Sequence, residues 1–89
     1  MKQKAKIEIY TWDHCPYCQK AIALLDKKSV KYIRYRIDGD ETAREKMAAR
    51  ANGKKSVPQV FIDDKHIGGC DDTHALDEKG ELDKLIFEQ

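Results

Sequence analysis

The sequence lacks long hydrophobic runs. Its longest purely aliphatic stretch covers residues 21–25, whereas a helix that spans a bilayer needs about 20 apolar residues. Lys2, Lys4 and Lys6 resemble the charged start of a signal peptide, but the next segment alternates polar and apolar residues instead of forming an apolar core of about 7–15 residues. We therefore expect no membrane span, no membrane partner, no secretion signal and a cytoplasmic location.

The chain also has little excess charge of either sign. Its 89 residues include 17 Lys and Arg against 16 Asp and Glu, so the formal net charge is +1. A protein that binds nucleic acid through phosphates needs a concentrated basic face, so we expect no nucleic-acid partner. Because domains usually have about 100–150 residues, a chain this short predicts one domain over residues 1–89.

Cysteine is scarce and unevenly placed. Two of the three cysteines form the motif Cys15-Pro16-Tyr17-Cys18, and Cys70 lies far along the chain. This is too few for a secreted disulfide framework, and the close pair indicates redox or metal chemistry. A structural zinc site needs four ligands, yet besides Cys70 only the isolated His14, His66 and His74 are on offer. We favour redox chemistry, expect no metal, and keep a zinc module as the lesser alternative.

Hydrophobic periodicity predicts alternating strands and helices in the first half of the chain. Residues 6–11 and 33–37 alternate as strands do, and we expect the first strand to bury one face strongly. Pro16 opens a helix expected over about residues 16–28. Asp40 can cap a second helix, with a core face of Ala43, Met47 and Ala51, that stops at Asn52-Gly53. The strand–helix–strand order makes the two strands parallel.

The second half of the chain predicts an antiparallel hairpin followed by helix. Residues 57–62 form a strand, residues 63–64 a tight turn, and residues 66–69 a short returning strand. Asp71 or Asp72 is expected to cap the next helix, and Gly80 to break it. The last apolar set, Leu82, Leu85 and Ile86, is spaced as in a short amphipathic helix.

The cysteine pair follows the first strand and opens the first helix. Unpaired backbone N–H groups and the positive end of the helix dipole stabilise a thiolate at Cys15, which we predict to be the nucleophile. Cys18 lies one turn further on and is more covered, so it suits the resolving thiol that attacks a mixed disulfide on Cys15. The reducing strength of the pair depends on the two residues between them.

Three motifs together resemble the glutaredoxin family of the dithiol class. They are Cys15-Pro16-Tyr17-Cys18, Ser56-Val57-Pro58 and Gly68-Gly69-Cys70-Asp71-Asp72, and the resemblance covers essentially the whole chain. It implies an α/β, thioredoxin-like fold with a four-stranded mixed sheet in the order β-α-β-α-β-β-α, flanked by helices. It also implies a monomer with glutathione as co-substrate that reduces glutathionylated or disulfide-bonded proteins. Some family members supply electrons to ribonucleotide reductase.

The resemblance further implies where glutathione binds. The Val57–Pro58 bond is expected to be cis, so that the Val57 backbone pairs with glutathione like an added strand; otherwise Pro58 simply starts an edge strand. Asp71 and Asp72 are expected to hold the γ-glutamyl end, to cap the helix, or to do both. With Cys15 and Cys18 as catalytic residues, the implied glutathione-binding residues are Tyr17, Ser56, Val57, Pro58, Gly69, Cys70, Asp71 and Asp72.

The chain departs from the family pattern in a few places. Trp12 stands where members often have a lysine for the glycine carboxylate of glutathione, and Lys55, Arg50 and His14 are, in that order, the expected replacements. Ser56 replaces the usual threonine and keeps its hydroxyl. For Cys70 we favour a small semi-buried residue, with glutathionylation left open.

Two further functions are kept as alternatives. A small redoxin fed by thioredoxin reductase shares the cysteine motif and the proline loop, but it needs no site for a γ-glutamyl group. An iron–sulfur cluster carrier is disfavoured, by resemblance, because Pro16 stiffens the motif.

Overall fold

The computed structural model describes residues 2–88. The elements follow in the order β1 (Ile7–Thr11), α1 (Pro16–Lys27), β2 (Ile33–Arg36), α2 (Glu41–Arg50), β3 (Gln59–Ile62), β4 (Lys65–Gly68), α3 (Cys70–Glu78) and α4 (Glu81–Phe87). This confirms the predicted α/β order. The final helical segment is divided into α3 and α4, because Gly80 between them has a φ of 75° that does not belong to a right-handed helix.

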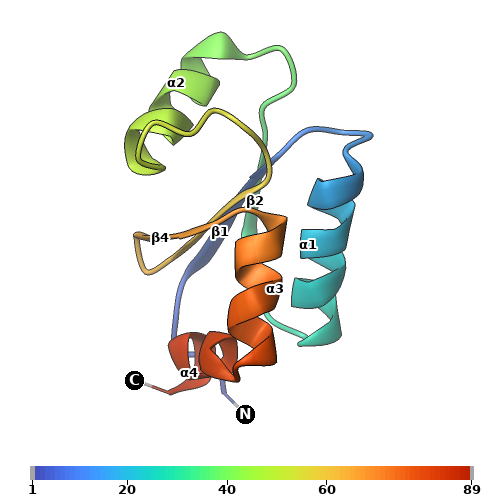
Figure 1. The fold of residues 1–89 in the computed structure, drawn as a ribbon, viewed down its shortest axis with the longest axis vertical. Helices are drawn as coiled ribbons and strands as arrows, with labels where there is room; N and C mark the ends of the chain where they lie inside the picture. Colours follow the sequence, from blue (N-terminus) through green and yellow to red (C-terminus); the bar gives the residue numbers. More distant parts are fainter. Residues whose placement is uncertain (1, 89) are drawn as a thin grey trace.

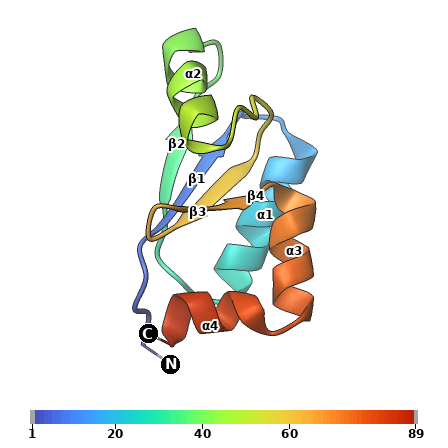
Figure 2. The same cartoon turned by 60° about the vertical axis from the view of Figure 1, so that its left-hand side comes forward.

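The four strands form one mixed sheet in the order β2-β1-β3-β4. The β1–β2 pair is parallel, whereas β3 runs antiparallel to both β1 and β4. Helices α1 and α3 cover one face of the sheet and α2 the other, with α4 across the end that also holds the N-terminal segment (Figures 1 and 2). This is the thioredoxin-like arrangement that the resemblance implied.

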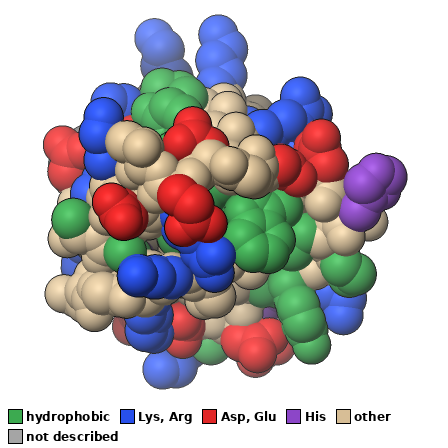
Figure 3. Space-filling view, turned by 90° about the horizontal axis from the view of Figure 1, so that it is seen from above, with side chains coloured by type: hydrophobic (Ala, Val, Ile, Leu, Met, Phe, Trp, Pro, Cys, Tyr) green, Lys and Arg blue, Asp and Glu red, His purple; other side chains and the backbone are tan. Residues whose placement is uncertain are grey.

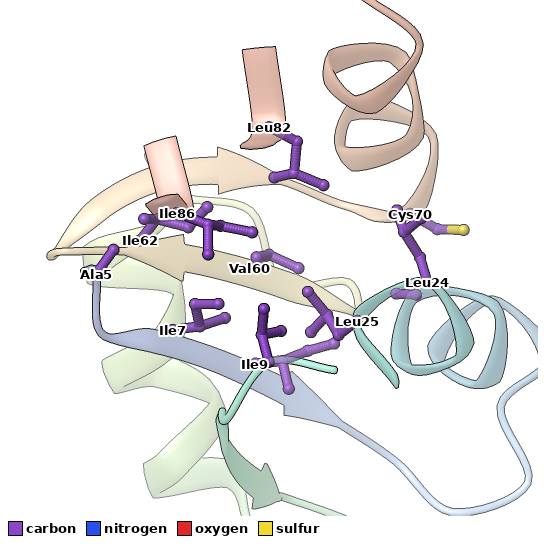
Figure 4. Packing of buried hydrophobic residues seen from close by; sticks show 12 residues of the cluster. Ala5, Ile7, Ile9, Leu24, Leu25, Val60, Ile62, Cys70, Leu82 and Ile86 are labelled. Carbon is purple, nitrogen blue, oxygen red and sulfur yellow. The ribbon is translucent and has the colours of Figure 1, made fainter. Parts of the chain in front are cut away.

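A large apolar cluster lies between the sheet and helices α1, α3 and α4 (Figure 4). Each of these elements contributes side chains that are almost completely buried. Strand residues Ile7, Ile9 and Val60 meet Leu25 of α1 together with Leu82 and Ile86 of α4. Removing these side chains from water is the main stabilising contribution in so small a domain. The short amphipathic helix predicted around Leu82 and Ile86 is therefore present and packed.

The second face of β1 is also buried, which corrects the expectation of one strongly buried face. All five residues of β1 are buried, because β1 is a central strand and α2 covers its other side. Glu8, only 3% exposed, accepts hydrogen bonds from Arg50 of α2 at 2.9 and 3.1 Å and from the Tyr35 hydroxyl at 2.8 Å. These partners compensate the cost of burying the carboxylate.

Several boundaries differ from the sequence prediction. Helix α1 ends at Lys27, one residue early, and β3 begins at Gln59 instead of residue 57, since Pro58 has no N–H to donate to a strand. Neither Asp71 nor Asp72 is the N-cap of α3, because Gly69 occupies that position. None of the helices formed by residues 2–88 has the length and apolar character that crossing a membrane requires.

Candidate active site

Cys15 lies at the junction between the C-terminal end of β1 and the start of α1. It is the N-cap of α1 with an extended backbone, Pro16 follows in the first turn, and the Cys18 N–H donates a hydrogen bond of 3.3 Å to the Cys15 sulfur. A sulfur in this position faces unpaired N–H groups and the positive end of the helix dipole. Because Cys15 is also partly exposed, it can meet a disulfide from outside.

Cys18 lies one turn into α1 and is fully buried. Burial raises the pKa of its thiol to about 12, with further increases from the hydrogen bond and the negative charge of Cys15. All three cysteines are free thiols. The two sulfurs of the motif therefore differ in the way that the sequence predicted: Cys15 is accessible, and Cys18 is covered and protonated at neutral pH.

A surface pocket of about 220 Å³ lies beside the cysteine motif. It is formed by the start of α1, the loop before β3, the first residue of β3 and the start of α3. Its lining is Tyr17, Lys54, Ser56, Val57, Pro58, Gln59, Gly69, Cys70, Asp71 and Asp72. The eight residues expected from the resemblance therefore come together in one place, and Lys54 and Gln59 are two that the sequence reasoning missed.

The loop before β3 forms one wall of this pocket. Its Val57–Pro58 bond is cis, as expected. The buried Gln59 amide donates hydrogen bonds to the Ser56 carbonyl oxygen at 3.0 Å and to the Ser56 hydroxyl at 3.3 Å. A side chain added at Gly69 would contact the Pro58 carbonyl oxygen at 3.4 Å, so the start of α3 packs directly against the loop.

The start of α3 forms the opposite wall. The carboxylate of Asp72 accepts a hydrogen bond from the Gly69 N–H at 3.2 Å, so Asp72 satisfies a helix-start N–H although it is not the N-cap itself. Gly68 has a φ of 124°, and a Cβ there would collide with the Asp72 carboxylate. Glycine at position 68 is therefore required both by its backbone conformation and by the close approach of Asp72.

The positive charge of the pocket comes from a lysine that the sequence analysis did not name. Arg50 is engaged by Glu8 and Asp64, and neither Lys55 nor His14 lines the pocket, whereas Lys54 does. Lys54 is therefore a further candidate for the glycine carboxylate, and the expected order of Lys55, Arg50 and His14 stays a prediction. The sequence offered no signal that distinguishes Lys54 from its neighbour Lys55.

Trp12 and Cys70 are both held by packing. The Trp12 ring packs on the cluster under α2, with the Arg44 guanidinium 5.1 Å from the ring centre. Cys70 is 7% exposed, with its sulfur 3.5 Å from His74 Nδ1. Burial, and to a lesser extent the charge of Asp71, raise the pKa of the Cys70 thiol.

The pocket lining carries charges of both signs, from Lys54 and from Asp71 and Asp72. Seen from the end of the molecule that carries α2, acidic and basic side chains are interspersed with apolar surface (Figure 3). Among residues 2–88, no group of three or more His, Cys, Asp or Glu side chains is placed so that it could hold a metal ion.

Comparison with known proteins identifies the family. The family model for glutaredoxin matches residues 7–67. A probable glutaredoxin of Synechocystis sp. is 64% identical over 86 residues, which cover 97% of this chain and 98% of that protein. The chain belongs to the glutaredoxin family. Glutaredoxin 3 of Escherichia coli is 52% identical over 82 residues, or 92% of this chain and 98% of that protein.

Solved structures agree with this assignment. The buckwheat glutaredoxin–glutathione complex superimposes with a TM-score of 0.86 at 26% identity, over 94% of this chain and 78% of that one. The protein therefore has the thioredoxin-like fold of the glutaredoxins and is a glutathione-dependent thiol-disulfide oxidoreductase.

Proposed function

We propose that this glutaredoxin reduces protein–glutathione mixed disulfides through Cys15 alone and protein disulfides through Cys15 and Cys18 together. The observation that carries the proposal is the asymmetry of the two thiols beside a surface pocket of about 220 Å³. Cys15 is accessible and faces a backbone N–H, whereas Cys18 is buried with a pKa of about 12. In such a pair, the accessible thiol can attack a substrate first, and the buried thiol can react in a later step.

In the one-cysteine route, the Cys15 thiolate attacks the glutathione sulfur of a mixed disulfide. The bond between glutathione and the substrate breaks, the substrate leaves as a thiolate that takes up a proton, and Cys15 becomes glutathionylated. A second glutathione thiolate then attacks the glutathione sulfur on Cys15. This step releases oxidised glutathione and restores the Cys15 thiolate. The net reaction converts the mixed disulfide and one free glutathione into the substrate thiol and oxidised glutathione, half of which comes from the mixed disulfide itself.

In the two-cysteine route, Cys15 attacks a protein disulfide and forms a mixed disulfide with the substrate. Cys18 loses its proton, attacks the Cys15 sulfur and displaces the substrate as a second thiol. The resulting Cys15–Cys18 disulfide is reduced by two glutathione molecules, which leave as oxidised glutathione. Electron exchange between glutathione and the cysteine pair can run in either direction. Glutaredoxin potentials of roughly −200 to −230 mV overlap the potential of the cytosolic glutathione couple, about −220 to −260 mV when measured by extraction.

The pocket supports a position for glutathione during both routes. The backbone of Val57 is proposed to pair with the cysteinyl unit, and Tyr17 to flank the glutathione sulfur. The start of α3 with Asp71 and Asp72 suits the carboxylate and ammonium of the γ-glutamyl end. Lys54 supplies the charge for the glycine carboxylate, and Ser56, Pro58, Gly69 and Cys70 complete the lining.

The proposed setting is the cytoplasm, where a reducing environment keeps the thiols free, with the protein acting as a monomer. Its proposed partners are glutathione and glutathionylated or disulfide-bonded proteins. Ribonucleotide reductase is the client proposed from the family resemblance. It can be tested by reconstituting electron transfer from glutathione to that enzyme.

The deciding experiment compares the wild type with Cys15→Ser and Cys18→Ser. Turnover of a glutathionylated peptide and of a protein disulfide is coupled to glutathione reductase and NADPH. We expect Cys15→Ser to lose both activities and Cys18→Ser to lose only the second. A wild type that is inactive with glutathione but is turned over by thioredoxin reductase would contradict the proposal and favour a redoxin.

A further inference from the structure

A chain of four polar side chains runs from the end of α2 to the pocket. Asn52 Nδ2 lies 3.2 Å from His66 Nδ1, and His66 Nε2 lies 2.7 Å from the Gln59 side-chain oxygen. The Gln59 side-chain nitrogen in turn donates to the Ser56 carbonyl and hydroxyl oxygens at 3.0 and 3.3 Å. This series of hydrogen bonds ends at Ser56, the residue that precedes the cis Val57–Pro58 bond.

The Ser56 carbonyl at one end determines which groups in this series of hydrogen bonds donate and which accept. The Ser56 carbonyl can only accept a hydrogen bond, so the Gln59 amide must present its NH₂ group there and its oxygen to His66. His66 Nε2 must therefore carry a proton and donate. His66 Nδ1 is then free to accept from the Asn52 amide. One neutral tautomer of His66, with the proton on Nε2, satisfies every contact in the chain.

The Gln59 amide depends on this donor because it is buried. Gln59 is 2% exposed, so its oxygen has little access to water, and a buried acceptor that loses its donor pays a desolvation penalty. The amide could relieve the penalty by rotating half a turn. Rotation would then turn its oxygen toward the Ser56 carbonyl, so that two acceptors face each other and the contact that holds the Ser56 backbone is lost.

Packing holds the His66 ring in place for this role. The ring packs against the Phe61 ring at a tilt of 36°, with a centroid distance of 5.3 Å, and the two residues are paired across β3 and β4. The charged groups that act on the ring are Lys54 from the loop and Asp72 from α3. Burial first, and then Lys54, lower the pKa of His66, against the opposing effect of Asp72. Protonation would leave the Nε2 proton in place and affect only the contact with Asn52.

We propose that His66 is a positioning residue for glutathione. By donating from Nε2 to Gln59, it orients the Gln59 amide, which holds Ser56 and thereby the Ser56–Pro58 wall of the pocket in the conformation that accepts the glutathione backbone. His66 does not touch the reacting sulfurs. This inference rests on the proposed binding of glutathione in that pocket, and it assigns the specificity for glutathione partly to a side chain outside the pocket lining.

The test uses two substitutions that separate the hydrogen bond from the packing. His66→Phe keeps an aromatic ring on Phe61 but removes the donor, whereas His66→Gln offers an amide N–H in its place. Tyr32→Phe is the matched control, because it also keeps an aromatic ring and removes one side-chain hydrogen bond, to Asp26, and neither residue lines the pocket. For each variant, kcat and KM are measured with a glutathionylated peptide, and alkylation of Cys15 by iodoacetamide reports on the nucleophile alone.

We expect His66→Phe to raise KM by about two- to tenfold, the range that one lost hydrogen bond produces. Its kcat and the alkylation rate should change less than twofold, His66→Gln should restore KM, and Tyr32→Phe should leave KM unchanged. A wild-type KM in His66→Phe would overturn the inference, as would an equal loss in His66→Phe and His66→Gln. A wild type without glutathione-dependent activity would instead overturn the proposed function.

A spectroscopic readout tests the same inference without turnover. Nitrogen-15 NMR of the wild type at pH 7.5 or above, roughly one unit over the ordinary pKa of histidine, should show the His66 proton on Nε2. The Gln59 side-chain amide should exchange slowly with solvent in the wild type and in His66→Gln, and faster in His66→Phe. A His66 proton on Nδ1 would overturn the proposed direction of the chain and the inference with it.

Discussion

The backbone N–H of Cys18 donates to the sulfur of Cys15, 3.3 Å away, while the Cys18 thiol itself is fully buried. One helical turn therefore supports negative charge on the first sulfur and opposes it on the second. Two of the causes that raise the pKa of Cys18, its hydrogen bond with Cys15 and the charge of Cys15, depend on Cys15 being free. Once Cys15 is joined to a substrate, its hydrogen bond and charge no longer raise the Cys18 pKa, so we expect Cys18 to become more reactive after the first step.

The resolving step should therefore depend strongly on pH. Burial, the largest cause of the raised Cys18 pKa, persists when Cys15 is held in a mixed disulfide, and the thiolate fraction below the pKa rises about tenfold per pH unit. We expect the rate of substrate release by Cys18, followed by stopped flow, to rise throughout pH 6–8. A plateau within that range would contradict the pKa assignment. The Cys18→Ser variant, which cannot resolve the disulfide, gives the background rate.

Lys54 should contribute to glutathione affinity through its charge. Lys54→Ala is expected to raise KM for a glutathionylated peptide by about two- to fivefold, since exposed ion pairs contribute up to about 1 kcal/mol. The effect should shrink at high ionic strength, because salt screens surface charges. Lys55→Ala is the matched control, since Lys55 does not line the pocket. An equal effect of the two substitutions would show that overall charge, and not the position of Lys54, is responsible.

Gly68→Ala should weaken the binding of the γ-glutamyl end of glutathione. The added methyl group would collide with the Asp72 carboxylate and push it away from the Gly69 N–H. Gly53→Ala is the control, since Gly53 also has a positive φ, of 85°, but nothing lies within 4 Å of the added carbon. We expect both variants to lose stability in thermal unfolding and only Gly68→Ala to raise KM for glutathionylated substrate. A normal KM in Gly68→Ala would argue against a role for Asp72.

The buried Glu8 should make the fold sensitive to acid. The hydrogen bond from Arg50 is the largest cause that lowers the Glu8 pKa below its ordinary value of 4.5. Ionised Glu8 therefore stabilises the fold fully at pH values above its pKa in the unfolded chain. This stabilisation is lost as the pH falls through its lower pKa in the folded protein. Glu8→Gln should reduce the free energy of unfolding at pH 7 by about 1–3 kcal/mol.

Glu8→Gln should also flatten the dependence of stability on pH below about 4.5. Denaturant unfolding at several pH values measures both effects, with Glu78→Gln on the exposed surface of α3 as the control. Identical pH profiles for Glu8→Gln and the wild type would show that the Glu8–Arg50 pair does not govern acid stability.

Local patterns were sufficient to predict most of the fold and the reactive end of the site. Strand alternation, Pro16 at a helix start, Asp40 as a cap and glycine at helix ends act within a few residues, so they can be recognised without knowing what packs against them. The same holds for the difference between Cys15 and Cys18. Their positions at the N-cap and one turn into α1 follow from their spacing, because helix geometry is fixed.

Contacts between distant segments decided what local patterns could not. The burial of Glu8 depends on Arg50, 42 residues away, and nothing in the alternation of β1 indicates that a helix covers its second face. The choice of Lys54 over Lys55 depends on how one loop turns. The link from His66 to Ser56 depends on the pairing of β3 with β4.

The sequence by itself therefore determined the order of the elements, the family resemblance and the positions of the two sulfurs proposed to react, because each follows from short-range chemistry along the chain. Only the tertiary structure decided which charges line the pocket, which carboxylate is buried and which polar chain supports the Ser56–Pro58 loop. Those properties arise when helices and strands far apart in the sequence exclude water from the same space. Burial then makes each buried hydrogen bond necessary and raises the pKa of the Cys18 and Cys70 thiols.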